Sequence, residues 1–179
     1  ENGHATAAFN VAIFYLNGSG VERNVEAAIK WFERASEGGI SAAQVQLGKL
    51  YSAGNGVPRD QKLAGEWLSR AALGGDADAK TAYALFLLHQ DGSTEPPAQA
   101  RSLLTEAAEA GHAAAAFQLG ALQLGKFGGT ADVRSAVPWF TRAASAGHVE
   151  AQYTLALLYA DPKNDMRDMQ VAASWMAKA

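Results

Sequence analysis

Residues 39–74 read GISAAQVQLGKLYSAGNGVPRDQKLAGEWLSRAALG, and this stretch decides the fold. Apolar side chains recur at helical spacing over residues 41–53, which predicts a first helix with one buried face. Gly54 suits the left-handed backbone conformation that ends such a helix. Asp60 is a residue type that caps helix N-termini, and a second apolar stripe follows it as far as Gly74. The stretch therefore predicts two helices joined by a glycine-rich turn.

The same pattern returns along the whole chain at intervals of 36 residues. Four columns hold one residue type in every copy: Gly3, Gly39, Gly75, Gly111 and Gly147; Ala7, Ala43, Ala79, Ala115 and Ala151; Ala28, Ala64, Ala100, Ala136 and Ala172; Ala35, Ala71, Ala107, Ala143 and Ala179. A fifth column is bulky, with Trp31, Trp67, Leu103, Trp139 and Trp175. Agreement in one register indicates an internal repeat. The repeats span residues 3–38, 39–74, 75–110, 111–146 and 147–179.

Small residues mark where the helices approach one another. One column of the first helices contains only alanine and glycine: Ala12, Gly48, Ala84, Gly120 and Ala156. A single hairpin cannot bury side chains as large as Leu47 and Trp67, whereas stacked hairpins bury them between neighbours. We therefore expect an all-α chain of ten helices. It should form a right-handed α/α solenoid, with one continuous core in a single domain over residues 1–179.

The starts of the second helices can be predicted from another column. It contains four capping residues and one proline suited to a first helical turn: Asn24, Asp60, Pro96, Asp132 and Asp168. The helix after Asp132 also contains Pro138, which has no N–H to donate to the carbonyl of Arg134. We expect this proline to kink that helix or to delay its start.

The motifs of repeat 2 resemble the Sel1-like repeat, a relative of the tetratricopeptide repeat. The matching residues are Ala43, Leu47, Gly48, Tyr51, Gly54, Asn55, Gly56, Val57, Asp60, Ala64, Trp67, Ala71 and Ala72. Repeat 1 shares most of them, with Tyr15, Gly18, Ser19, Gly20, Val21, Ala28 and Trp31. The resemblance covers the whole chain. It weakens where Ser93 replaces valine in repeat 3 and Gln123 replaces tyrosine in repeat 4.

The resemblance implies a protein-interaction scaffold, often in bacterial envelope or signalling assemblies, with first helices on a concave wall and second helices on a convex one. Residues opposite the buried stripe of the first helices are then expected to contact a partner peptide or helix: Phe9, Ile13, Asn17, Val45, Lys49, Leu85, His89, Phe117, Tyr153 and Leu157. A contiguous apolar strip on a surface usually marks a binding site. The column of Phe9, Val45, Thr81, Phe117 and Tyr153 has an alternative role, which is packing against the neighbouring repeat.

Composition narrows the function classes. Apolar residues make up 49% of the chain and charged residues 18%, with a net charge of −3 and scattered Lys and Arg. Nucleic acid is therefore not an expected partner. There is no cysteine for a disulfide or a thiolate metal site, and no apolar stretch of the roughly 20 residues that span a bilayer. The start at Glu1 without methionine suggests a piece of a longer chain. An envelope location is slightly favoured by the family resemblance.

Catalytic and metal-binding patterns are missing. His4, His112 and His148 occupy one column, and equivalent points in adjacent repeats lie about 8–10 Å apart, too far to share a zinc ion. They are better explained as solvated helix-start residues, and His89 as a surface residue. The glycine-rich turns lack the Gly-Lys-Ser/Thr ending of a phosphate loop. We therefore expect no catalytic residue, no cofactor and no metal.

Three functions remain in order of preference. The first is an interaction module that binds a peptide or helix of a partner protein. The second is a structural spacer or oligomerisation element without a bound peptide. The third is an accessory domain that contacts glycan, for which the groove has few aromatic and carboxamide side chains. The chain stops within the last buried column, so residues around Trp175 and Met176 are expected to pack on a neighbouring molecule or on further sequence.

Overall fold

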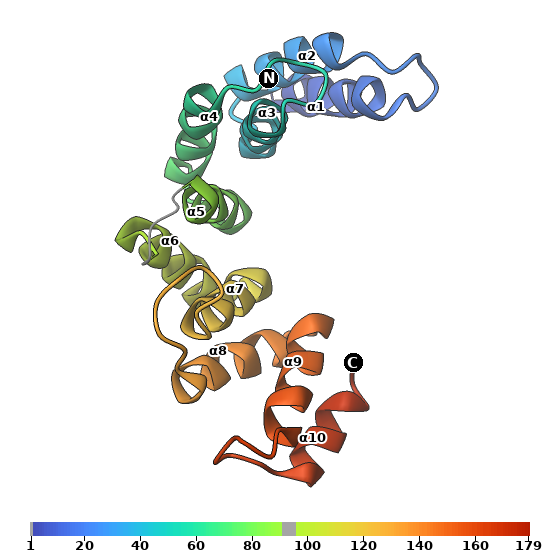
Figure 1. The fold of residues 1–179 in the computed structure, drawn as a ribbon. Helices are drawn as coiled ribbons and strands as arrows, with labels where there is room; N and C mark the ends of the chain where they lie inside the picture. Colours follow the sequence, from blue (N-terminus) through green and yellow to red (C-terminus); the bar gives the residue numbers. More distant parts are fainter. Residues whose placement is uncertain (1, 91–95) are drawn as a thin grey trace. The chain divides into compact units, whose positions relative to one another are not determined.

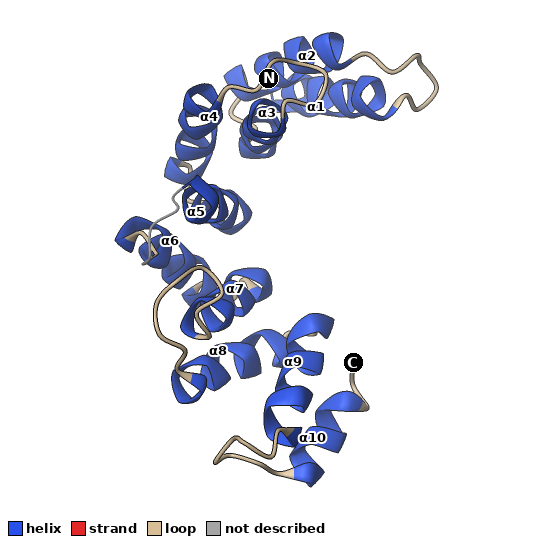
Figure 2. Cartoon of the chain, viewed as in Figure 1, coloured by secondary structure: helices blue, strands red, loops and turns tan. Residues whose placement is uncertain are grey.

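A computed structural model describes residues 2–90 and 96–179 (Figure 1). Its ten helices are α1 (Asn2–Asn17), α2 (Val25–Glu37), α3 (Ser41–Ala53), α4 (Gln61–Leu73), α5 (Ala77–Gln90), α6 (Ala98–Glu109), α7 (Ala113–Gln123), α8 (Val133–Ser145), α9 (Val149–Ala160) and α10 (Met169–Met176). The described residues form no strand, only an isolated bridge between Lys126 and Gly128 (Figure 2). The predicted all-α fold is confirmed. None of these helices is long and apolar enough to cross a membrane.

The chain divides into two compact units, residues 1–86 and 87–179. In the first unit α1 packs on α2, α2 on α3, and α3 on α4. In the second unit α6 packs on α7, α7 on α8, α8 on α9, and α9 on α10. Each unit is thus a row of helical hairpins in chain order, as a repeat array requires. A single core through both units stays a prediction. The turn with Ser93 lies outside the described residues.

Four second helices begin where their capping residues predict. The caps of α2, α4, α8 and α10 accept hydrogen bonds from backbone N–H groups of the first turn, and they are Asn24, Asp60, Asp132 and Asp168. Such a cap satisfies a donor that the helix itself leaves unpaired. The third repeat differs, because α6 begins at Ala98 after Pro97. Pro96 therefore precedes the helix and does not occupy its first turn.

Pro138 does not delay its helix. The helix α8 begins at Val133, directly after the cap, so a delayed start is wrong, while the alternative of a kink stays a prediction. The reason is the strength of the first turn, in which the hydroxyl and the N–H of Ser135 both donate to the carboxylate of Asp132. These hydrogen bonds lower the pKa of Asp132. The turn is thus closed before the chain reaches the proline, which removes one later backbone bond.

Histidines cap two first helices of the second unit. The Nδ1 atoms of His112 and His148 accept hydrogen bonds of 3.3 Å from the N–H groups of Ala115 and Ala151. The ring of His148 also stacks on Phe117, with 4.6 Å between ring centroids. The predicted position at a helix start is confirmed. His148 is not solvated as expected, however, since only 18% of its side chain is exposed.

The histidine cap leads to a stability prediction. His148→Ala removes both the cap and the stacking on Phe117, whereas His148→Asn keeps a side-chain acceptor for the first turn of α9. We expect the alanine variant to be less stable than the asparagine variant by about 1 kcal/mol. Urea denaturation of both variants measures the difference. Equal stabilities would show that the hydrogen bond to Ala151 contributes nothing.

The core of the first unit lies between consecutive hairpins. Its largest cluster joins α1, α2 and α3 through Ala8, Ala12, Val25, Ala28, Ile29, Phe32, Ala35, Ala43, Leu47 and Leu50. Trp31, Tyr51 and Trp67 are partly buried against it. A Cβ at Gly48 would lie 2.5 Å from Cγ of Leu68, so α3 and α4 approach closely at this glycine. The close approach predicted from the small-residue column is therefore confirmed here.

The second unit repeats this arrangement. Its fully buried large side chains are Leu104, Leu119, Phe140 and Leu155. Phe117 packs on Phe140 with 5.6 Å between ring centroids. A Cβ at Gly120 would lie 2.7 Å from the Phe140 ring, which places another glycine at a close helix approach. The small residue of α7, Gly120, and the residue after the bulky column in α8, Phe140, thus face each other across this hairpin.

Candidate partner-binding surfaces

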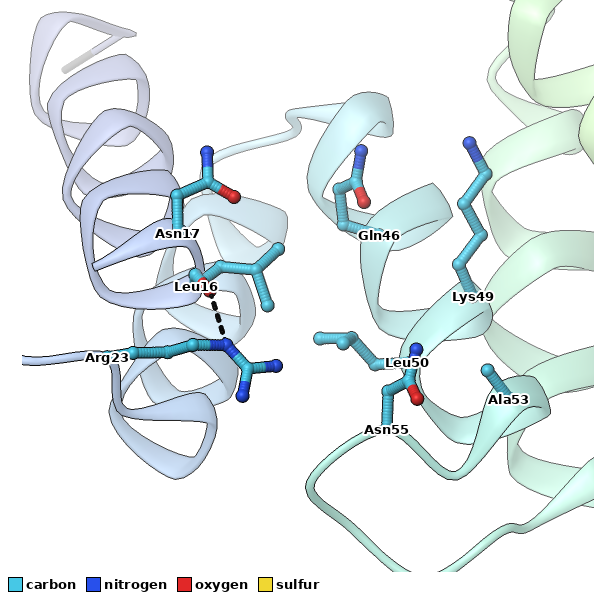
Figure 3. A pocket seen from close by; sticks show the side chains of 8 residues that line it. All are labelled: Leu16, Asn17, Arg23, Gln46, Lys49, Leu50, Ala53 and Asn55. Carbon is cyan, nitrogen blue, oxygen red and sulfur yellow. Dashed lines mark hydrogen bonds between the residues drawn. The ribbon is translucent and has the colours of Figure 1, made fainter. Parts of the chain in front are cut away.

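The first unit contains an open pocket of about 540 Å³ between the C-terminal end of α1 and α3 (Figure 3). We call it the first-unit pocket, and it is lined by Leu16, Asn17, Arg23, Gln46, Lys49, Leu50, Ala53 and Asn55. The helices α1 and α3 are the first helices of consecutive repeats. Stacking of the repeats brings their lining residues to the same pocket, and the loops that follow the two helices add one residue each.

Two leucines form the apolar part of the first-unit pocket. Leu16 comes from α1 and Leu50 from α3, and their side chains point toward each other across the pocket (Figure 3). Leu50 is only 7% exposed, because its other side belongs to the core cluster. Leu16 is half-buried against the same cluster. An apolar side chain of a bound molecule would therefore find a preformed contact surface between them.

Polar side chains surround these leucines. The amides of Asn17 and Gln46 and the ammonium of Lys49 extend in the same direction in Figure 3, while Arg23 and Asn55 come from loops. The Nε atom of Arg23 donates a hydrogen bond of 3.1 Å to the carbonyl of Leu16. This bond holds the guanidinium beside the end of α1. The pocket therefore combines carboxamides, which both donate and accept, with two cationic donors.

The first-unit pocket is cationic in a chain of net charge −3. Its lining contains Arg23 and Lys49 but no Asp or Glu. Neither cation forms an ion pair with a carboxylate in the described part of the chain. Both side chains are exposed. A carboxylate of a bound molecule could therefore pair with either cation without displacing a carboxylate of this chain.

The predicted contact residues of the first unit fall into three groups: two line the pocket, one is buried and three are half-buried. Asn17 and Lys49 line the same pocket, as a shared binding surface requires. Val45 is 8% exposed and lies in a core cluster with Leu68, so its predicted contact with a partner is corrected to packing. The remaining three are half-buried, and they are Phe9, Ile13 and Leu85. Phe9 packs on Phe32, which is the alternative role considered for its column.

The four predicted contact residues of the second unit differ in how far they are exposed. Phe117 is packed between Phe140 and His148. His89 is exposed, and its ring meets the Phe127 ring edge-on at 5.6 Å. Tyr153 and Leu157 are 50% and 49% exposed on α9. None of the four lines the pocket described for this unit, so their contact with a partner stays a prediction.

Sequence reasoning missed the loop residues of the first-unit pocket. Arg23 and Asn55 lie in turns that had been interpreted only as helix ends. A signal was present, because Arg59 occupies the position of Arg23 one repeat later, and Ser19 that of Asn55 one repeat earlier. A polar residue that recurs near a turn glycine therefore indicates a possible contact residue. The direction in which its side chain points, however, depends on the neighbouring repeat.

A second pocket, of about 400 Å³, lies in the second unit between the start of α8 and the loop after α9. Its charged residues have both signs, and Arg134 pairs with Asp165. Hydrogen bonding to Asp165 raises the pKa of Arg134. No group of three or more metal-ligating side chains occurs among the described residues. The lining holds three aspartates against Arg134 and Lys163, so this pocket is a weaker candidate for an acidic ligand than the first-unit pocket.

Comparison with known proteins explains the repeat. The family model for the Sel1 repeat matches residues 5–40, 41–76, 77–112, 113–148 and 149–179. The chain belongs to the Sel1 repeat family. Each of these repeats starts two residues after the glycine at which the sequence analysis began it, so both sets of boundaries describe the same hairpins. Sel1 repeats are generally protein–protein interaction modules and typically have no catalytic role. A comparison with curated proteins gave no match.

Solved structures of Sel1 repeat proteins resemble this chain. A Sel1 repeat protein from Oxalobacter formigenes has a TM-score of 0.79 and 32% identity, over 97% of this chain and 71% of that one. A protective antigen present in uropathogenic Escherichia coli strains has a TM-score of 0.76 and 29% identity, over 97% of this chain and 38% of that one. An immunity protein from Pseudomonas aeruginosa, 19% identical with a TM-score of 0.66, shares the fold. The neighbours confirm an all-α solenoid fold, and the three named here come from bacteria.

Proposed function

We propose that this Sel1 repeat protein is a scaffold that binds a segment of a partner protein in the first-unit pocket. The observation that carries the proposal is the presence of both Arg23 and Lys49 in a lining without carboxylates. The segment would place acidic side chains against these two cations, which lie in different parts of the lining (Figure 3). Charge-assisted hydrogen bonds of this kind are stronger than those between neutral groups.

The rest of the pocket supports a peptide as the ligand. Leu16 and Leu50 provide a contact surface for one apolar side chain next to the acidic ones. Asn17, Gln46 and Asn55 provide both donors and acceptors, which suit the N–H and C=O groups of a peptide backbone. A volume of about 540 Å³ lies within the range of sites that hold small ligands or short segments. The expected ligand is therefore short, amphipathic and acidic.

The proposal can be tested with two labelled peptides that differ only in charge. One alternates leucine with aspartate and glutamate, and the other carries asparagine and glutamine at the same positions. Fluorescence anisotropy should show that the acidic peptide binds at least about tenfold more tightly, with an affinity that falls as salt is added. Equal affinities for the two peptides would contradict the proposed role of the cations.

Charge reversal in the pocket supplies the matching variant. Arg23→Glu with Lys49→Glu should abolish binding of the acidic peptide, because the carboxylates then repel it. The control is Lys30→Glu with Lys62→Glu, which changes net charge equally at exposed positions of α2 and α4. The control should retain most of the affinity. If both double variants lose binding alike, the attraction is non-specific and the pocket is not the site.

The biological setting remains part of the proposal. The family resemblance favours a bacterial envelope or signalling assembly, and the solved neighbours come from bacteria. Fractionation of cells that express the protein, followed by cross-linking at Lys49, would locate it and identify the molecule in contact with the pocket. Recovery of the protein without any cross-linked partner would favour the structural spacer instead.

A further inference from the structure

Two asparagines in the lining of the first-unit pocket are each followed by a glycine. They are Asn17, at the end of α1, and Asn55, in the turn after α3. An Asn-Gly pair can lose ammonia without an enzyme, because the backbone nitrogen of the glycine can attack the side-chain carbonyl carbon of the asparagine. Glycine has no Cβ to obstruct this approach. Each pair is therefore a candidate for conversion of a carboxamide into a carboxylate.

The backbone protects the first of these pairs. The N–H of Gly18 donates a hydrogen bond of 2.8 Å to the carbonyl of Phe14, and the N–H of Ser19 donates one of 3.0 Å to the same oxygen. Asn17 itself is the last residue of α1. The nitrogen that would attack is thus engaged in ending the helix, and the end of α1 must open before Asn17 can react.

The second pair lacks this protection. The turn after α3 is fixed at its start, where the N–H of Gly54 donates a hydrogen bond of 3.0 Å to the carbonyl of Leu50. The N–H groups of Asn55 and Gly56 donate to no acceptor in the described part of the chain. Both residues are exposed. The attacking nitrogen of Gly56 is therefore available, and water reaches the pair.

The fold requires the glycine of this pair but not the asparagine. Gly56 has a φ of +79°, and a Cβ on it would lie 2.6 Å from Cγ2 of Val25. A side chain there would strain the backbone and overlap the start of α2. Asn55 is under no such constraint, since its equivalent in repeat 1 is Ser19. The turn thus fixes the reactive glycine, and the residue before it decides whether the reaction occurs.

We propose that Asn55 deamidates spontaneously in the folded protein and that the product weakens binding of an acidic segment. The nitrogen of Gly56 loses its proton and bonds to Cγ of Asn55, and the bond from Cγ to the amide nitrogen breaks as ammonia leaves. Water then adds to one carbonyl of the resulting succinimide ring and breaks its bond to the ring nitrogen, which regains a proton. The product is an aspartate or an isoaspartate, and each carries a carboxylate.

The new carboxylate would oppose the cations of the first-unit pocket. Before the reaction the lining contains Arg23 and Lys49 and no Asp or Glu. The side chain of Asn55 points from its turn into this pocket (Figure 3). An acidic ligand would then meet a like charge, whereas a neutral ligand would not. This effect on binding rests on the proposed function, while the deamidation itself does not.

Peptide mapping by mass spectrometry tests the deamidation in protein kept in a warm, mildly alkaline buffer. The reaction exchanges an amino group for a hydroxyl, which raises the mass of the fragment that contains the residue. In the folded protein Asn55 should convert at least about tenfold faster than Asn17, which reacts only when the end of α1 opens. In urea both pairs should convert at similar rates. An Asn55 that stays intact in the folded protein overturns the proposal, and so do equal rates at the two sites there.

Fluorescence anisotropy with the acidic peptide tests the effect on the pocket. At low salt, fully converted protein should bind about fivefold more weakly than fresh protein, and Asn55→Asp should show the weaker binding from the start. Asn55→Gln is the matched control, because its longer side chain cannot close the succinimide ring. Whatever its starting affinity, this variant should lose none of it on ageing.

The two measurements separate the two proposals. Unchanged affinity after complete conversion of Asn55 overturns the effect on the pocket, and so does an equal loss of affinity on ageing in Asn55→Gln. Fresh protein that binds no acidic peptide contradicts the proposed function instead. The mass spectra decide the deamidation in either case, because they do not depend on a ligand.

Discussion

Phe140→Ala is expected to lower the free energy of unfolding of the second unit by about 3–5 kcal/mol. Phe140 is 1% exposed, and its ring packs on Phe117 and against Gly120. Truncation removes this apolar surface from the core. It also leaves a cavity between α7 and α8, because helices joined to their neighbours on both sides relax only partly.

The loss should be local. In a linear repeat array each hairpin contacts only its neighbours, so the second unit should lose more amide protection than α1–α3 in hydrogen exchange. Tyr153→Ala is the control, since it truncates an aromatic residue that is 50% exposed on α9. It should change stability by no more than about 1 kcal/mol. A loss below about 1 kcal/mol for Phe140→Ala would show that the hairpin repacks around the vacant volume.

Gly48→Val is expected to destabilise the first unit by about 3 kcal/mol, near the upper end for overpacked cores. A Cβ at this position lies 2.5 Å from Cγ of Leu68 and 3.2 Å from the backbone carbonyl of Ala64. The leucine can change rotamer, but the carbonyl belongs to the backbone of α4. The two helices must therefore move apart, which loosens the packing of Leu47 and Leu68 as well.

The neighbouring position provides the control for Gly48→Val. Lys49→Val introduces the same residue into the same helix, but on its exposed side. Its cost is the difference in helix propensity, about 0.5 kcal/mol. Thermal or urea unfolding of the two variants separates steric overlap from propensity. Similar stabilities of the two variants would show that α3 and α4 are free to separate at Gly48.

In α2, α4, α6 and α8 the most deeply buried large side chain directly follows the bulky column of Trp31, Trp67, Leu103 and Trp139. Trp31, Trp67 and Trp139 are partly buried, whereas Phe32, Leu68 and Phe140 are at most 3% exposed. Both columns are apolar in nearly every repeat, so periodicity alone cannot rank them. Their difference arises because the second helix turns the residue after the tryptophan toward the first helix of its own hairpin, as Leu68 lies against Gly48 and Phe140 against Gly120.

The repeat, the ten helices and most caps were determined by the sequence alone. These features depend on interactions within a few residues, such as the hydrogen bond between Asp60 and the N–H of Leu63 or the positive φ of Gly54. Local interactions of this kind follow from residue type and spacing. Because a single hairpin cannot bury its apolar face alone, the repeated hairpins must stack on one another to bury these faces.

The tertiary structure decided which of the remaining apolar and charged residues are accessible. Val45 and Lys49 lie four positions apart on one helix, yet one is buried against α4 and the other lines a pocket. His148 was expected in water but stacks on Phe117 of the preceding repeat. Phe14 and Met176 are exposed, whereas the residues at the same positions of the other repeats are buried or partly buried. Exposure depends on which hairpin lies alongside, and that neighbour is absent from any single repeat motif.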